Sequence, residues 1–395
     1  MRPNSPRPPN PPPLSAAPTF TKIKFPIISL LLFAWLFSGC TQQHPHEVTL
    51  FPHPTTARIV WQLGPEKSGT VASLALHPDG KHIVIGRSDG KIAIWTIGAT
   101  KPDIVIPVRW NWVATVKISP DGKLLAWASI NQPGRPISRT TPQAPLLMQV
   151  REWETGKSTD LPFEITSVDY EMQFSPDSKY LAALGNLPNS RLRVLDTSTL
   201  GLVLNHYDLN ASGGPTFFVD AAGNLQLVAL WQQWELHDSS ATLKRKVPYA
   251  DVSLFVRAFS REGKYVFMSS PPTFANERIG FAPWIVFGNS GIDVRTQEGA
   301  DVSYLTFWGR GSHTVRVRDF IPDPRDDAKG LVIAQVSSEG KQDPVVVDIS
   351  THRYQSLLPS NWPGRWHGTC DVSVSLDGRN VAIGGEPGVV IWELP

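Results

Sequence analysis

The first residues that could do chemistry are Gly86-Arg87-Ser88-Asp89-Gly90, which fit the pattern G-x-S-x-G of a nucleophilic serine. That chemistry needs a sharp turn between a strand and a helix, so that the serine hydroxyl stands exposed. Here Ile92-Ala93-Ile94-Trp95 follows at once, and this apolar, β-branched segment predicts a second strand. We therefore interpret the motif as a hairpin turn without catalysis.

Two other groups could hold a metal ion. Asp323, Asp326 and Asp327 gather in one polar turn and could contact calcium, but they lack the spacing and the closing glutamate of a calcium-binding loop. A solvated acidic turn is the simpler interpretation. The pair His44-Pro45-His46 has no third ligand nearby. The motifs HExxH and CxxC, the P-loop and the dinucleotide-binding glycine set do not occur in the sequence, so no cofactor is predicted.

A third group combines aromatic with basic residues, which are the side chains that dominate binding hot spots. They occupy short connections and two long proline-rich segments, residues 131–146 and 269–283. Loops of that length in a compact domain are usually functional or disordered, and we favour a function. The candidate partner-binding residues are Trp110, Arg135, Arg139, Phe274, Arg278, Phe281, Trp362, Arg365, Trp366 and His367. The alternative is that the indoles pack between neighbouring elements, which we favour for Trp112.

The elements that must position these residues form a repeat. Its clearest copy, residues 71–97, contains three alternating segments separated by the turns Pro78-Asp79-Gly80 and Ser88-Asp89-Gly90. Matching polar turns recur at residues 119–123, 175–179, 220–224, 260–264 and 375–379, with an expanded one at 321–330. Units of roughly 40 to 60 residues with four short strands each predict the blades of a β-propeller.

Seven such units account for the chain after its leader. We place them at about residues 71–108, 112–165, 167–208, 214–248, 252–300, 313–359 and 368–395. The last unit has only three strands, whereas Ala57–Leu63 is a strand without a unit of its own. If that strand completes the last blade, no sheet edge is left open at the seam. The predicted fold is therefore all-β: a seven-bladed β-propeller, residues 57–395, closed by an N-terminal strand.

Three segments carry a family resemblance: residues 86–95, Val389-Val390-Ile391-Trp392 and Val150-Arg151-Glu152-Trp153-Glu154. Each resembles the end of a WD repeat, although Thr and Glu replace Asp after Trp95 and Trp392 and no Gly-His pair opens the blades. The chain thus resembles a degenerate bacterial WD-repeat propeller. The resemblance implies a binding platform without catalysis of its own. It also implies that two kinds of loop share one face: those joining second to third strands, and those leading to the next blade.

The first 39 residues have the features of a secretory leader. Lys22 and Lys24 precede an apolar run of about 13 residues, which is too short for a permanent membrane span. Leu36-Phe37-Ser38-Gly39-Cys40 resembles a bacterial lipobox, in which the cysteine is lipidated and becomes the first mature residue. The alternatives are an ordinary signal peptide or an uncleaved anchor. Residues 40–56 are then expected to be the lipidated cysteine and a polar tether, and residues 1–19 a proline-rich extension.

Cysteine usage and charge support an envelope protein that does not bind nucleic acid. The chain has two cysteines, so a lipidated Cys40 leaves Cys370 without an intramolecular partner. Cleavage before Cys40 removes four basic residues and no acidic one, which moves the net charge from +2 to about −2. Thr41 after the cysteine, where an aspartate would retain the protein, indicates the outer membrane. We expect a monomer facing the periplasm or the cell surface.

Two functions are consistent with these features. The first is a lipid-anchored platform that binds another protein or a component of the cell envelope. The second is a propeller enzyme of the lactonase or quinoprotein type, with a metal or cofactor in the central channel. Such an enzyme needs several inward carboxylates or histidines at strand starts around the axis, and only scattered candidates occur, such as Asp251, Asp301 and Asp371. We therefore expect the platform, whose partner the sequence does not identify.

Overall fold

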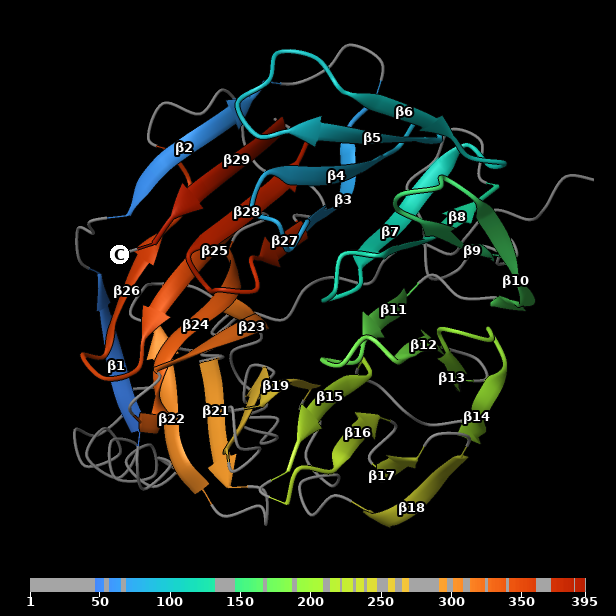
Figure 1. Cartoon of the computed structure of the whole chain (residues 1–395). Coiled ribbons are helices and arrows are strands. Elements are labelled where there is room, and N and C mark those ends of the chain that lie inside the picture. The colour runs from blue at the N-terminus through green and yellow to red at the C-terminus, as the bar shows by residue number, and fades with distance from the viewer. Residues whose placement is uncertain are drawn as a thin grey trace, which may run out of the picture. The chain divides into compact units, whose positions relative to one another are not determined.

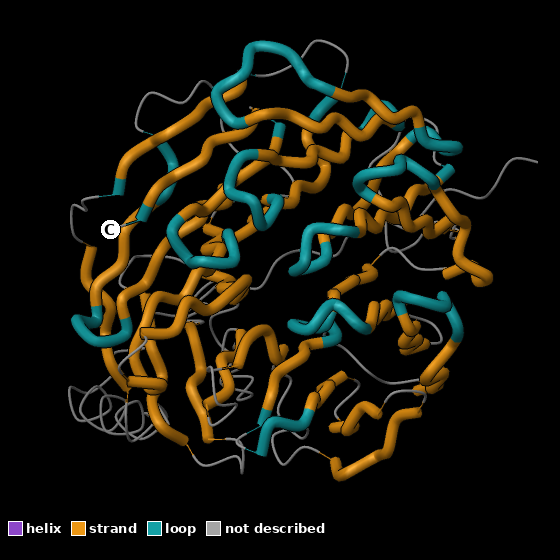
Figure 2. Tube along the Cα trace, in the orientation of Figure 1, coloured by secondary structure: helices purple, strands orange, loops and turns teal. Residues whose placement is uncertain are grey.

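The computed structural model divides into two units, residues 1–42 and 43–395, and all described residues belong to the second. The structure describes residues 47–52, 57–64, 69–131, 146–165, 169–186, 190–208, 214–220, 222–229, 232–237, 240–246, 255–259, 265–269, 291–296, 301–307, 313–323, 326–338, 341–359, 371–386 and 388–394. Within these ranges every regular element is a β-strand, and the strands are joined by turns and loops (Figure 2). The predicted all-β class is confirmed for this part of the chain.

Four antiparallel sheets contain four strands each in chain order. Their strands are β3 (Val71–Leu76), β4 (His82–Arg87), β5 (Lys91–Thr96) and β6 (Ile104–Pro107); β7 (Trp112–Ile118), β8 (Leu124–Ile130), β9 (Leu146–Glu152) and β10 (Ser158–Ile165); β11 (Asp169–Phe174), β12 (Tyr180–Asn186), β13 (Ser190–Asp196) and β14 (Leu202–Asp208); and β15 (Thr216–Val219), β16 (Leu225–Ala229), β17 (Gln232–His237) and β18 (Ser240–Lys246). Four-stranded sheets whose strands are connected by hairpins are what the sequence predicts for the blades.

A fifth four-stranded sheet joins the two ends of the second unit. Its strands, in spatial order, are β2 (Arg58–Leu63), β29 (Gly388–Glu393), β28 (Asn380–Gly385) and β27 (Asp371–Val374). β2 is antiparallel to β29, and the Arg58 guanidinium forms an ion pair with the Glu393 carboxylate. The predicted closure of the last blade by an N-terminal strand is therefore confirmed.

The remaining strands form one nine-stranded sheet with two antiparallel halves. One half contains β19 (Phe255–Phe259), β20 (Tyr265–Ser269), β21 (Gly291–Thr296) and β22 (Asp301–Phe307); the other contains β23 (His313–Asp323), β24 (Asp326–Ser338), β25 (Lys341–Asp348) and β26 (Arg353–Ser356). β22 pairs with β21 and extends beyond residue 300. The unit boundary expected at residue 300 is wrong, because the segment between residues 296 and 301 connects two strands of one hairpin.

Residues 40–56 were expected to form the lipidated cysteine and a tether, but residues 47–52 form the strand β1 (Glu47–Pro52) between the two halves. β1 pairs in parallel with β22 on one side and with β26 on the other. The Leu50 side chain is fully buried, in a cluster with Phe267, Leu305 and Val347. Burying a leucine stabilises the fold by about 1.5 to 3 kcal/mol, so this segment belongs to the folded unit. Any tether that starts at Cys40 is therefore shorter than expected.

The sheets follow one another around a common centre, with the first strand of each innermost (Figure 1). Consecutive innermost strands contact one another from β3 through β7, β11, β15 and β19 to β23, and β27 contacts β3. Buried apolar clusters lie between neighbouring sheets; one contains Ile333 and Val346 together with Val372 and Ile383. The core is thus distributed over the seams between the sheets.

The repeated polar turns explain why the first two strands of a sheet form a hairpin. In the turns that begin at Ser119, Ser175 and Ser375, the serine hydroxyl donates to the aspartate two residues later at 2.6 Å. The same carboxylate oxygen accepts a backbone N–H at 3.1 Å. Gly122 and Gly378 take the positive φ that closes this turn, and Ser178 has a φ of 63° at the equivalent position.

Candidate functional site

The turn between β4 and β5, residues 87–91, lies where the G-x-S-x-G motif suggested a nucleophile. Both flanking segments are strands, and they pair with each other antiparallel. Gly90 has a φ of +75°, which a tight hairpin turn requires and which favours glycine. The motif is therefore a hairpin, as the sequence predicts.

This hairpin turn contacts the connections on both of its sides. Ser88 N–H donates to the Thr70 carbonyl at 3.0 Å, and Thr70 N–H donates to the Ser88 hydroxyl at 2.9 Å. Val108 N–H donates to the Gly90 carbonyl at 3.0 Å. A Cβ on Gly90 would lie 2.6 Å from the Trp110 carbonyl, so only glycine fits. The two loop types expected to share a face therefore meet at this blade; we call residues 69–70, 88–90 and 108–111 the loop face.

Charges at the loop face converge on one carboxylate. Arg87 donates to both Asp89 oxygens, through Nε at 3.1 Å and through an Nη at 3.2 Å. Lys91 Nζ donates to the same carboxylate at 3.1 Å. Arg87 is only 7% exposed, so this ion pair is held in a fixed geometry beside the turn. Two cations around one anion leave a net positive charge at this point.

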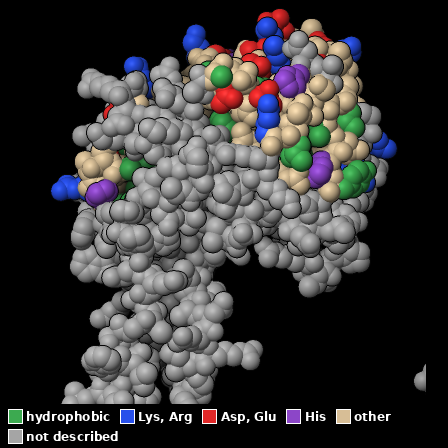
Figure 3. All heavy atoms as spheres, turned by 90° about the horizontal axis from the view of Figure 1, so that it is seen from below, with side chains coloured by type: hydrophobic (Ala, Val, Ile, Leu, Met, Phe, Trp, Pro, Cys, Tyr) green, Lys and Arg blue, Asp and Glu red, His purple; other side chains and the backbone are tan. Residues whose placement is uncertain are grey.

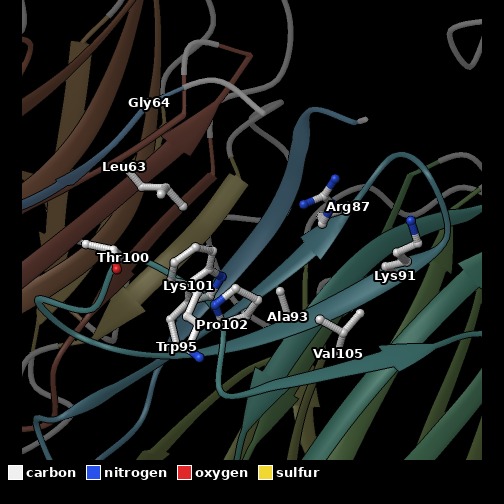
Figure 4. Close-up of a pocket in the computed structure, with 10 residues that line it drawn as sticks. All are labelled: Leu63, Gly64, Arg87, Lys91, Ala93, Trp95, Thr100, Lys101, Pro102 and Val105. Carbon is white, nitrogen blue, oxygen red and sulfur yellow. The ribbon is translucent and has the colours of Figure 1, made fainter. Parts of the chain in front are cut away.

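A groove of about 600 Å³ begins at the same turn (Figure 4). It runs between the end of β2 and the strands β5 and β6. Three of its side chains are cationic, and Trp95 and Val105 add apolar surface. The lining residues are Leu63, Gly64, Arg87, Lys91, Ala93, Trp95, Thr100, Lys101, Pro102 and Val105. Among the described atoms, the buried Trp95 Nε1–H has no hydrogen-bond partner. Such a groove suits an anionic, partly apolar ligand.

Of the partner-binding residues that the sequence suggested, the structure describes Trp110. It is half-buried in the loop face, next to Gly90. The others lie outside the described residues: Arg135, Arg139, Phe274, Arg278, Phe281, Trp362, Arg365, Trp366 and His367, together with Cys40. Trp112, the first residue of β7, is also half-buried and pairs in register with Ile130.

Of the aspartates considered for a catalytic channel, the structure describes Asp371 and Asp301, and of these two Asp371 lies on an innermost strand. Asp371 begins β27, an innermost strand, and accepts hydrogen bonds from the Ser73 hydroxyl at 2.6 Å and from Leu74 N–H at 3.0 Å. The Ser73 hydroxyl in turn accepts the Val116 N–H at 3.1 Å. This chain of bonds links three neighbouring sheets. Asp301 begins β22, the fourth strand of its half-sheet and not an innermost one, and Asp251 lies outside the described residues.

The three aspartates considered for calcium lie at a hairpin end. Asp323 ends β23 and pairs in register with Asp326, the first residue of β24, while Asp327 is the next residue. The expanded turn predicted there is therefore two strands that continue almost to the tip. Within the described side chains, the group suited to a metal ion is a different one, formed by His77, Asp79 and His82.

The histidine group lies at the β3–β4 turn and is not among the sites that the sequence suggested. The His82 Nδ1 lies 2.5 Å from one Asp79 oxygen, and the His77 Nδ1 lies 3.1 Å from the other. Burial raises the pKa of Asp79, but hydrogen bonds from Lys81 N–H and from the His82 ring and N–H outweigh it and lower the pKa to about 2. The spacing H-x-D-x-x-H is the signal that could have revealed this cluster.

The charge on the visible described surface is mixed. Acidic and basic side chains are interspersed in the space-filling view, with histidines among them (Figure 3). The near-neutral net charge of the whole chain, +2, agrees with this distribution.

Residues 47–118 match the family described as Anaphase-promoting complex subunit 4 WD40 domain. The match starts at the first residue of β1 and stops at the last residue of β7, so it includes β2 and the complete β3–β6 sheet. This similarity supports a WD-repeat-type fold and indicates a scaffold for protein interactions. Among the described residues there is no helix long and apolar enough to cross a membrane.

Proposed function

We propose that this protein is a lipid-anchored, extracytoplasmic β-propeller that binds a protein partner or an envelope component through its loop face and has no catalytic activity. The observation that carries the proposal is the meeting of both loop types at the β4–β5 turn, beside a cationic and apolar groove. In a ring of similar blades the same topology brings the corresponding loops of every blade to one side. We propose that the loop face continues on that side over residues 131–146, 269–283 and 360–367.

Seven blades are the number that this arrangement supports. The five four-stranded sheets and the two halves of the nine-stranded sheet each have an innermost strand, namely β3, β7, β11, β15, β19, β23 and β27. β1 then acts as an extra strand between the outer edges of two blades. It covers two edges that would otherwise expose unpaired backbone groups.

The groove defines the chemistry of the partner. Lys101 and the net positive charge of the Arg87–Asp89–Lys91 group favour carboxylates, while Trp95 and Val105 favour an apolar or aromatic side chain. An acidic peptide segment that carries one apolar anchor meets both requirements. Proline in each of residues 131–146, 269–283 and 360–367 limits the entropy that is lost on ordering, which favours a preformed platform.

The anchor is Cys40. Cys40 and Glu47 are seven residues apart, and a fully extended chain of that length spans at most about 25 Å. A lipid on Cys40 would therefore hold the propeller close to the bilayer surface. A single acyl chain binds membranes only marginally, so stable anchoring requires two or three chains on this cysteine.

Detergent partitioning tests the anchor. We expect Cys40→Ser to move the protein from the detergent phase to the aqueous phase or to leave its leader uncleaved, because both lipidation and processing need the thiol. Cys370→Ser is the matched control and should partition like the wild type. A Cys40→Ser variant that still enters the detergent phase after normal processing would exclude lipid anchoring.

Chemical cross-linking in the native envelope, followed by affinity purification of the full chain, tests the binding function. We expect one dominant partner, whose capture is reduced several-fold by Lys101→Glu in the groove. Lys123→Glu reverses a charge in a turn between first and second strands and should leave capture unchanged. Equal loss with both variants would indicate non-specific electrostatic capture and would exclude the groove.

A further inference from the structure

The β3–β4 turn combines three metal-ligating side chains that the binding function does not use. The ligand atoms of His77, Asp79 and His82 all lie within 4.8 Å of one another. Tetrahedral zinc ligands at about 2.0 to 2.1 Å from the ion are separated by about 3.3 Å. The spacing of the three groups therefore allows them to contact one ion after small side-chain rotations.

The hydrogen bond of His77 fixes which ring nitrogen is available. His77 Nε2 lies 3.1 Å from the Gly122 carbonyl oxygen, which can only accept, so this nitrogen carries the proton. The lone pair is then on Nδ1, the nitrogen that faces Asp79. Metal-ligating histidines characteristically donate their second ring nitrogen to a carbonyl or carboxylate in this way. A bound metal would replace the Asp79 N–H contact to Nδ1 at 3.2 Å.

Surrounding contacts hold the site in place before any ion arrives. The Trp153 ring lies over the His77 ring, with centroids 4.2 Å apart. The backbone N–H of Trp153 donates to the Lys123 carbonyl at 2.8 Å, which attaches the residue that carries this indole to the neighbouring β7–β8 turn. A Cβ on Gly122 would lie 2.9 Å from the His77 ring, so glycine makes room for the imidazole. His77 is buried, whereas His82 remains partly exposed and open to solvent.

A comparison with the other turns shows that the hairpin itself does not require these histidines. Ser119, Ser175 and Ser375 occupy the position of His77, and their hydroxyls bind the turn aspartate at 2.6 Å. The position of His82 is occupied by Leu124, Tyr180 and Asn380. The turn of the first blade therefore carries two histidines, whereas in the other three turns a serine and an unrelated residue at these positions are enough to form the hairpin.

From these contacts we infer that His77, Asp79 and His82 form a zinc-binding site. Two imidazole nitrogens and one carboxylate suit Zn²⁺ better than Ca²⁺ or Mg²⁺, which prefer oxygen ligands alone. Three protein ligands leave a fourth position for water or for a group from a partner. All three ligands come from the β3–β4 turn, and Gly122 of the β7–β8 turn and Trp153 of the β9–β10 turn contact the His77 ring. None of the ligands belongs to the loop face or to the groove.

Calorimetric titration of the full chain with zinc chloride, purified without a polyhistidine tag, tests this site. We expect one equivalent to bind and to raise the melting temperature, since a ligand bound only by the folded state stabilises it. His77→Ser restores the turn found in three other blades, and His82→Leu copies the turn at Leu124, so both variants should fold. Each should weaken zinc binding at least 100-fold.

Asp177→Asn is the matched control, because it alters the same turn in a blade without the histidines. It should leave zinc affinity unchanged. The site is overturned if the wild type binds no zinc at micromolar concentration. It is also overturned if folded His77→Ser and His82→Leu bind zinc as tightly as the wild type, since the ion would then lie elsewhere.

Discussion

At the scale of single residues, polar side chains on the innermost strands hold the blades together. The Asp371 carboxylate, the Ser73 hydroxyl and the Val116 N–H form one hydrogen-bonded chain across three sheets. A similar bond joins Phe217 N–H to Gln173 Oε1 at 3.3 Å. A carboxylate on an innermost strand can therefore stabilise the contact between blades, and Asp371 has this role here.

We expect Ser73→Ala to lower the free energy of unfolding by about 1 to 3 kcal/mol, because a buried N–H and a carboxylate each lose a partner. Urea denaturation measures this loss. Ser129→Ala is the matched control: Ser129 is equally buried, and its hydroxyl has no hydrogen-bond partner among the described atoms. That variant should change stability by less than about 0.5 kcal/mol. Equal effects would contradict the role given to the chain of bonds.

The turn aspartates make stability dependent on pH. The hydrogen bond from the Ser375 hydroxyl, together with Arg379 N–H, lowers the pKa of Asp377 despite partial burial. A carboxyl whose pKa is lower in the folded state contributes fully above its unfolded pKa of about 3.9, and this contribution is lost as the pH falls further.

Asp377→Asn keeps the acceptor oxygen and removes the charge. It should cost about 1 kcal/mol at pH 7 and much less at pH 3, where the wild type has begun to lose the same contribution. Thermal unfolding at both pH values measures the difference. Leu376→Ala, a substitution of the exposed neighbour, should show neither effect. A penalty for Asp377→Asn that is the same at both pH values would contradict the assignment.

At the scale of elements, the sequence predicts the strands whose signals are local. Tight turns such as Ser119-Pro120-Asp121-Gly122 specify each hairpin. β2 is recognisable because it has the pattern of a strand, although the sequence around it supplies no other strands for a blade of its own. β1 could not be predicted in this way. Residues 47–50 of β1 alternate polar and apolar side chains, but the strand pairs in parallel with two strands more than 250 residues away, so no adjacent turn marks it.

Deletion of residues 57–63 tests the role of β2 as the closing strand. The deletion removes the buried Trp61 and leaves β29 with an open edge, so we expect a loss of several kcal/mol and a broadened or absent unfolding transition. Differential scanning calorimetry shows this directly. Ile59→Ala alters a side chain of the same strand that is 40% exposed, and it should unfold nearly like the wild type. A cooperative transition that the deletion leaves unchanged would exclude closure by β2.

At the scale of the whole molecule, the repeat predicts where loops gather but not what they bind. The strand order that places Ser88, Thr70 and Val108 together is a property of the blade, so the shared face could be inferred before any contact was known. The groove could not, because Leu63 and Trp95 come from strands that meet only when the ring closes. The His77 cluster was missed because a serine normally fills that position of the turn.

The dissociation constant of the captured partner tests binding through the loop face most directly. We expect Trp362→Ala and Trp366→Ala each to weaken binding about 30-fold or more, equivalent to about 2 kcal/mol, with an unchanged melting temperature. Leu376→Ala, which truncates a 70% exposed side chain in a turn between first and second strands, should bind like the wild type. If both tryptophan variants bind normally, or lose binding only because they unfold, the partner does not bind the loop face.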